Sequence, residues 1–189
     1  MRRLCLCTVL LLLLGLSVRQ PSNEVFAQSG GEWTTLLDGS TLDGWNMIGD
    51  ATWTLVDGAV EGDGEAGFLV TAESFSDFQL TFEFWIGENS NSGVFIRCSD
   101  QEQVGIDTSY EVNIADAIEN QDFRSGAIVR VMAPSQTVKT AGKWNTYDIT
   151  ARGDKLTVIL NGITTADAED DQFSSGVIAL QHRTGLVKF

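Results

Sequence analysis

Apolar and polar residues alternate with a period of two along most of the chain after residue 32. The clearest stretch is FQLTFEFWI at 78–86, where every second residue, starting with Phe78, is apolar and the residues between them are polar apart from Trp85. Successive side chains of a strand point to opposite faces, so this pattern predicts a strand buried on one side. No later stretch shows the 3.6-residue apolar periodicity of a helix.

Turn signals divide the rest of the chain into further short strands. Asp57-Gly58 predicts a tight hairpin turn, Arg152-Gly153-Asp154 a second turn and Asn161-Gly162 a third. About ten short strands separated by such turns are typical of a two-sheet antiparallel sandwich. We therefore predict an all-β fold with further strands at 53–56, 59–61, 68–71, 93–98, 110–114, 127–132, 144–150, 155–160 and 177–181.

The N-terminal segment has the three parts of a secretory signal peptide. A basic start, MRR, precedes an apolar run at 4–16, and a polar region then ends in Val-Phe-Ala at 25–27. The apolar run is shorter than the roughly 20 residues that a membrane-spanning helix needs, and its cysteines stand at its front, so we expect neither a membrane anchor nor a lipid anchor. We predict a signal peptide at 1–27, a connector at 28–35, one domain at 36–189, and export to the periplasm or the exterior.

Charge and cysteine content narrow the class of partner. The 189 residues carry 12 basic and 26 acidic side chains, and removal of 1–27 leaves 9 and 25, a net charge of −16. That field repels phosphate backbones, so nucleic acid and anionic membranes are disfavoured as partners whereas neutral sugars are not. Cys98 is the one cysteine of the mature chain, so no intrachain disulfide forms, and its strand position predicts a small buried side chain facing the core.

Alternate residues of a strand share a face, and this strand parity predicts that several polar side chains lie on one face. If the aliphatic residues of 93–98 face the core, Arg97 faces out, and if those of 110–114 face the core, Glu111 and Asn113 face out. The three side chains then share one polar surface. That surface is either a site or a place where Arg97 and Glu111 form a cross-strand ion pair.

The carboxylates and the histidine allow few kinds of chemistry. A conventional glycosidase needs two carboxyl groups flanking the scissile bond, but Glu111 and Asp116 have opposite parity on an extended chain, which disfavours that pair. His182 is the only histidine, so any histidine base or ligand must be this residue. The alternative is a structural or exposed histidine.

Metal ligands and aromatic residues leave further alternatives open. One histidine and one mature cysteine cannot make a usual zinc site, and the sequence requires no cofactor, although an oxygen-ligated cation such as calcium remains an option. Trp45, Trp85 and Trp144 are candidates for stacking on sugar rings, with Trp85 outward by parity, or for ordinary packing. The candidate calcium ligands are Asp63, Glu65, Asp167, Asp170 and Asp171, which solvated acidic loops also explain.

Several short motifs, in order from Leu36 to the end of the chain, resemble one family. They include LLDG at 36–39 with LDGW at 42–45, DFQL at 77–80, NSGV at 91–94, YEVNI at 110–114, KWN at 143–145 and the stretch at 176–181. This ordered set resembles the 3-keto-disaccharide hydrolase domain family of exported bacterial proteins. The family commonly has Gln where Asn113 stands, places a histidine two residues after Gln181 instead of at once, and usually continues past Phe189.

The resemblance implies a fold and a reaction. The fold is a jelly-roll sandwich of the concanavalin A-like lectin and glucanase type. The reaction is net hydrolysis of a 3-keto-glycoside: the ketone acidifies the C2 proton, a base removes it, the C1 substituent leaves, and water adds to the enone. Such a mechanism needs one base and one group that steadies the enolate.

Motif position and strand parity together predict the site residues. Glu111 is expected to act as the general base or a metal ligand, Arg97 to hold the substrate carbonyl, and His182 to complete the catalytic set. A non-catalytic carbohydrate-binding module on the same jelly roll is the alternative, because a fold does not fix a function. The residues expected to contact substrate are Asn113, Asp116, Gln181, Trp85 and Trp45.

Overall fold

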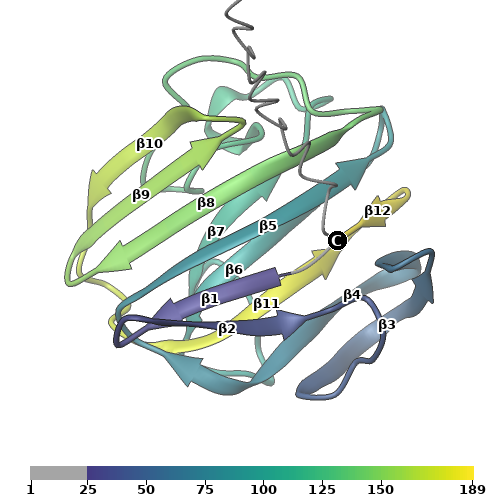
Figure 1. The fold of residues 1–189 in the computed structure, drawn as a ribbon. Coiled ribbons are helices and arrows are strands. Elements are labelled where there is room, and N and C mark those ends of the chain that lie inside the picture. The colour runs from purple at the N-terminus through teal and green to yellow at the C-terminus, as the bar shows by residue number, and fades with distance from the viewer. Residues whose placement is uncertain (1–24) are drawn as a thin grey trace, which may run out of the picture.

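The computed structural model describes residues 25–189, which form an all-β, two-layer sandwich (Figure 1). Most of the predicted signal peptide, residues 1–24, lies outside the described residues. The single helical turn among the described residues is the 3-10 turn Gln121–Phe123. The strands are β1 Val25–Ser29, β2 Glu32–Leu37, β3 Trp45–Val56, β4 Ala59–Phe75, β5 Phe78–Ile86, β6 Ser92–Cys98, β7 Tyr110–Ile114, β8 Trp144–Arg152, β9 Lys155–Leu160, β10 Ile163–Glu169, β11 Gly176–His182 and β12 Val187–Lys188.

The strands pair antiparallel in the order β10-β9-β8-β5-β12-β4-β11-β6-β7, with β1 on β5 and β3 on β4. This sheet folds over so that β8 and β5 of one layer face β11 and β6 of the other (Figure 1). The core between the layers includes Phe82 and Tyr147 on one side and Ile178 on the other. Tyr147 also donates a hydrogen bond across the layers to the carbonyl oxygen of Asn113. The predicted all-β sandwich is therefore confirmed.

Three strands have the bounds that the sequence predicts. The observed bounds of β5, β7 and β9 coincide with the predicted ranges 78–86, 110–114 and 155–160. The Asp57-Gly58 turn also forms as predicted, with φ of +52° and +80°, between β3 and β4. Both of these strands are much longer than predicted.

Two predicted segments differ in the structure. The expected connector at 28–35 belongs largely to the hairpin β1–β2, because Gly30 and Gly31 both take positive φ and close a two-residue turn. β1 also contains Val25 to Ala27 of the predicted signal peptide, so cleavage after Ala27 remains a prediction. The expected strand at 127–132 is wrong, because Arg130 at φ +66° closes a tight turn in which Met132 donates back to Ile128.

In the layer β4–β11–β6–β7, the strands β6 and β11 are buried on both of their sides. Val94, Ile178 and Leu180 face the core, whereas Val70, Phe95 and other residues form a second apolar cluster on the opposite side. We call that opposite side the outer face. The loop at 99–109 lies on it, with Val104 and Ile106 packed against the cluster. Polar groups on this face are therefore partly shielded from solvent.

A β-bulge at Arg97 reverses the expected direction of two side chains. Phe95 pairs with Ala179 and Cys98 with Val177, so two residues of β6, Ile96 and Arg97, stand opposite one residue of β11. Arg97 has a φ of +52°, which breaks the alternation. Cys98 therefore joins the outer cluster, whereas the sequence pattern predicted that it faces the core. Arg97 does not share the outward direction of Glu111.

Among residues 25–189, no helix has the length and apolar character needed to cross a membrane.

Candidate functional site

Glu111 stands on the outer face of β7, opposite Phe95 of β6. Its carboxyl group lies over Gly93, because a Cβ atom added to Gly93 would come within 2.7 Å of Glu111 Oε1. Burial raises the pKa of Glu111 to about 7, although the positive charge of Arg183 opposes that rise. A carboxylate with this pKa can both accept and return a proton near neutral pH.

Gln181 flanks the same glycine from the other side. Leu180 of β11 pairs with Val94 of β6, which places Gln181 beside Gly93 on the outer face, and Phe68 of β4 lies opposite Gln181. The side chain of Gln181 is only 7% exposed. Its Oε1 atom is buried and has no hydrogen-bond partner among the described residues.

Glu111, Gln181, Gly93, Phe68 and Arg183 define what we call the Glu111 site. The sequence predicted Glu111 and Gln181 as site residues but gave no role to the other three. The position of Gly93 inside a predicted strand could have indicated the site, since a glycine inside a strand often marks a place where another group approaches closely. No such indication exists for Phe68 and Arg183, because their positions depend on the pairing of strands distant in sequence.

Asn113 lies on the same strand as Glu111, but its side chain is used within the protein. Asn113 Nδ2 donates to the carbonyl oxygen of Phe123, and its Oδ1 accepts from the backbone N–H of Ile114 at 3.0 Å. The residue is 3% exposed. It therefore fastens the segment that follows β7 and presents no free polar atom to a ligand.

Arg97 is buried and bonded to the protein through all three guanidinium nitrogens. Its Nε and Nη1 atoms donate to the carbonyl oxygens of Ser76, Gly153 and Phe173 at 2.7–3.2 Å. Its Nη2 atom lies 3.1 Å from Asp77 Oδ1. Arg97 thus joins turns at one end of the sandwich, and the predicted ion pair with Glu111 is absent.

Asp116 follows β7 and holds the chain segment that leads into β8. Its carboxylate accepts hydrogen bonds from the backbone N–H groups of Thr140 and Ala141 at 2.6 and 2.9 Å, and from the hydroxyls of Thr140 and Ser125, both at 2.8 Å. Burial opposes its ionisation, but these hydrogen bonds outweigh burial and lower the pKa of Asp116. Asp116 is thus an ionised structural group and does not pair with Glu111 as a second catalytic carboxyl.

His182 ends β11 and points to the side opposite Gln181. It is fully buried, with Nδ1 2.9 Å from the carbonyl oxygen of Glu65 and Nε2 2.7 Å from that of Gly185. Both ring nitrogens are therefore in contact with the backbone. The structure does not bring His182 together with Glu111 on the outer face.

The two predicted tryptophans lie away from the Glu111 site. Trp45 donates from Nε1 to the carbonyl oxygen of Leu36 at 2.6 Å and packs against the core. Trp85 stands on β5 of the other layer, opposite Trp144 of β8. The ammonium group of Lys188 lies 5.9 Å from the Trp85 ring.

The acidic residues proposed as calcium ligands do not form a cluster. Within the described part of the chain, no group of three or more His, Cys, Asp or Glu side chains is arranged to hold a metal ion. Asp167 instead accepts from Thr157 and pairs with Lys155, and Asp170 accepts from Tyr110. Within residues 25–189, the five candidate ligands therefore do not come together as a calcium site.

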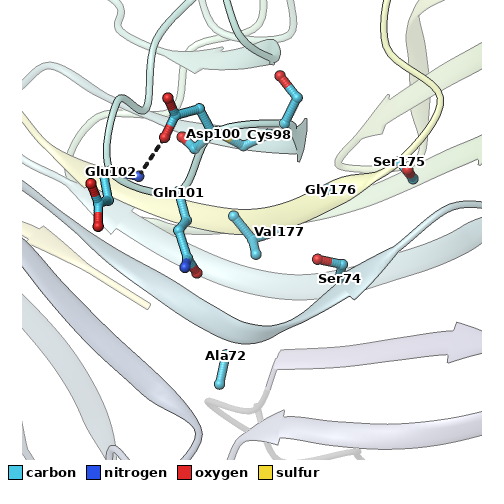
Figure 2. A pocket seen from close by; sticks show the side chains of 10 residues that line it. Ala72, Ser74, Cys98, Asp100, Gln101, Glu102, Ser175, Gly176 and Val177 are labelled. Atoms are coloured by element: carbon cyan, nitrogen blue, oxygen red, sulfur yellow. Dashed lines mark hydrogen bonds between the residues drawn. The ribbon is translucent and has the colours of Figure 1, made fainter.

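A hollow of about 710 Å³ opens on the outer face beyond the 99–109 loop (Figure 2). Ala72, Cys98 and Val177 line it from β4, β6 and β11, and the loop contributes Gln101 and Glu102. Asp100 Oδ1 accepts from the backbone N–H of Glu102 at 3.0 Å, which holds the loop's turn in place. Hydroxyl, amide and carboxylate groups also line the hollow, and none of its lining residues belongs to the Glu111 site.

Residues 32–189 match the model of the 3-keto-alpha-glucoside-1,2-lyase-like domain. A curated relative from Bacteroides thetaiotaomicron, named 3-keto-disaccharide hydrolase, is 28% identical over 145 residues. That alignment covers 60% of this chain and 50% of the relative, so the chain spans about half the relative's length.

Two solved structures share the fold. A crystal structure from Parabacteroides distasonis, named as a candidate glycosyl hydrolase, is 25% identical with a TM-score of 0.64, and the match covers 72% of this chain and 86% of that one. A carbohydrate-binding module (CBM66) from Bacillus subtilis is 21% identical with a TM-score of 0.61, over 76% of this chain and 90% of that one. The predicted jelly-roll sandwich is confirmed by these likenesses.

Proposed function

Since the chain belongs to the 3-keto-alpha-glucoside-1,2-lyase-like domain family, we propose that it is an exported, carbohydrate-active enzyme that cleaves 3-keto-glycosides. The family match and the name of the Bacteroides relative support the substrate class. The basic and apolar N-terminal pattern supports export to the periplasm or the exterior. The observation that supports the proposal is the half-buried carboxyl group of Glu111, which lies over Gly93 beside the buried side chain of Gln181.

The chemistry needs one base, and Glu111 supplies it. The ionised carboxylate takes the C2 proton, the C2–H electron pair forms an enolate with the C3 ketone, and expulsion of the C1 oxygen gives an enone. The proton on Glu111 then passes to the departing alcohol, and water adds to the enone to complete net hydrolysis. Arg183, whose positive charge lowers the pKa of Glu111, can steady the enolate oxygen.

The pH dependence of this reaction follows from the pKa of Glu111. We expect kcat/KM for release of alcohol from a 3-keto-glucoside to rise about tenfold per pH unit below pH 7 and to level off above it, because the base works only when ionised. A pH-rate profile from pH 5 to pH 9 measures this. Absence of release at every pH contradicts the proposed activity, and a rate that falls as pH rises through 7 contradicts Glu111 as the base.

Gly93→Ala tests the position of the carboxyl group. The new methyl group would lie within 2.7 Å of Glu111 Oε1, so the flexible carboxyl end must move while the backbone stays. We expect kcat to fall about 10- to 100-fold with little change in stability. Gly105→Ala, which meets open space on the same face, serves as the matched control, and equal kcat values for the two variants contradict the assignment.

A carbohydrate-binding module is the second candidate function. Trp85 and Trp144 stand opposite each other on adjacent strands, with Trp144 37% exposed, and aromatic faces of this kind stack on sugar rings. The shared fold of the Bacillus subtilis module fits this alternative. Binding of intact glycans that is lost in Trp144→Ala, without turnover of any keto sugar, favours the module over the enzyme.

A further inference from the structure

The buried carbonyl oxygen of the Gln181 side chain has no hydrogen-bond partner among residues 25–189. Buried acceptors in proteins are nearly always paired, and one that is not lowers stability unless a ligand or water completes it. Trp53 and Arg124 also carry an unpaired buried nitrogen, but neither belongs to the Glu111 site. Gln181 is therefore the unpaired group placed to meet a ligand of Glu111.

The neighbours of Gln181 explain why the protein itself does not satisfy it. Phe68 on one side has no hydrogen-bonding group, and Gly93 on the other has no side chain. Glu111, when ionised, is itself an acceptor. Among the described residues no donor reaches Gln181 Oε1, so a hydroxyl group of a bound ligand can supply the missing hydrogen bond.

The spacing of the strands suits a single sugar ring. β7 and β11 flank β6, so their backbones are roughly 10 Å apart at about 4.8 Å per pair. Glu111 reaches back over Gly93 into this interval, which shortens the gap to Gln181. One ring can therefore present a C–H bond to Glu111 and an O–H group to Gln181, and the apolar ring of Phe68 fits its C–H edge.

We propose that Gln181 Oε1 accepts a hydrogen bond from a ring hydroxyl of the same sugar that carries the ketone, and that it makes the site selective for keto sugars that retain this hydroxyl. The proposal rests on the proposed function and narrows its substrate class. A site that buries an acceptor for a hydroxyl rejects the analogue without that hydroxyl, because the acceptor is then left unpaired.

Gln181→Met tests this assignment, since methionine keeps the length of the side chain and removes the strong acceptor. The kcat/KM and Kd values of wild type and variant are measured for a 3-keto-glucoside and for its 2-, 4- and 6-deoxy analogues. At one ring position, we expect removal of the hydroxyl to lower kcat/KM about 10- to 100-fold for wild type and less than about threefold for Gln181→Met. Gln79→Met, on the outer side of the other layer, is the control and keeps the wild-type pattern.

The outcomes separate the two proposals. If deoxygenation at every position costs wild type and Gln181→Met equally, the role of Gln181 is wrong even where turnover is normal. If wild type releases no alcohol, the proposed activity is wrong, and the Kd comparison still decides the role of Gln181. A merely structural role predicts a lower denaturation midpoint for Gln181→Met, whereas loss of an unpaired acceptor predicts an equal or higher one.

Discussion

Replacement of Glu111 by glutamine is expected to lower kcat for a 3-keto-glucoside by about 10²- to 10⁴-fold, the usual contribution of a general base. Glutamine has nearly the same shape and can occupy the space over Gly93 that the carboxyl group fills. It cannot take the C2 proton, however, and Asp116, tied to Thr140, Ala141 and Ser125, cannot replace it. The measurement is alcohol release under saturating substrate.

The same variant has a second expected effect, on stability. The pKa of Glu111 is raised from 4.5 to about 7 in the folded protein. The protonated carboxyl group therefore stabilises the folded state in full below pH 4.5, and this stabilisation is lost as pH rises through 7. Between pH 4.5 and pH 8, the free energy of unfolding of wild type should therefore fall by roughly 1–3 kcal/mol relative to that of Glu111→Gln. Denaturant titrations at both pH values measure the difference.

Glu169→Gln is the matched control for both measurements, because Glu169 is an exposed carboxylate of the strand β10 at the edge of the other layer. It should change neither kcat nor the pH dependence of stability. A kcat for Glu111→Gln within a factor of three of wild type would show that another group removes the proton.

The strands and the directions of their side chains were predictable where one face of a strand is buried and the other is exposed to solvent. In β5 the buried and half-buried residues alternate without a break, so the sequence pattern and the structure have the same period. β6 and β11 are buried on both faces, and for such strands apolar content indicates a strand but not the direction of each side chain. β1 and β2 are not among the predicted strands, because Gly30-Gly31, which closes their hairpin, lies within the predicted connector at 28–35.

The site was predictable only in part, for a related reason. Parity correctly placed Glu111 on the outer face, since β7 is regular along its length. The same rule misplaced Arg97, because one extra residue in β6 shifts everything beyond it to the other side. A bulge is a property of two paired strands, and it leaves no mark in the period of either strand alone.

Arg97→Ala should be the most destabilising of the substitutions considered, by about 3–5 kcal/mol. The change removes the donors to the carbonyl oxygens of Ser76, Gly153 and Phe173 and leaves these acceptors without that partner in a region where the arginine side chain is 1% exposed. A hydrogen bond to a charged group contributes about 1.5–3 kcal/mol, so the loss of three such bonds accounts for a cost of this size. Since a domain of this size is stable by only about 5–15 kcal/mol, the variant should unfold at markedly lower denaturant concentration.

Arg130→Ala is a matched control, because Arg130 also has a positive φ, of +66°, and also pairs with an aspartate, Asp107. Its side chain is 59% exposed, so the pair contributes at most about 1 kcal/mol. Arg97→Lys should recover little, since an ammonium group cannot match the fixed fork of donors that reaches three separate turns. If Arg97→Ala and Arg130→Ala have equal unfolding midpoints, Arg97 does not hold the end of the sandwich, and a role in binding substrate returns as the better explanation for an arginine at this position.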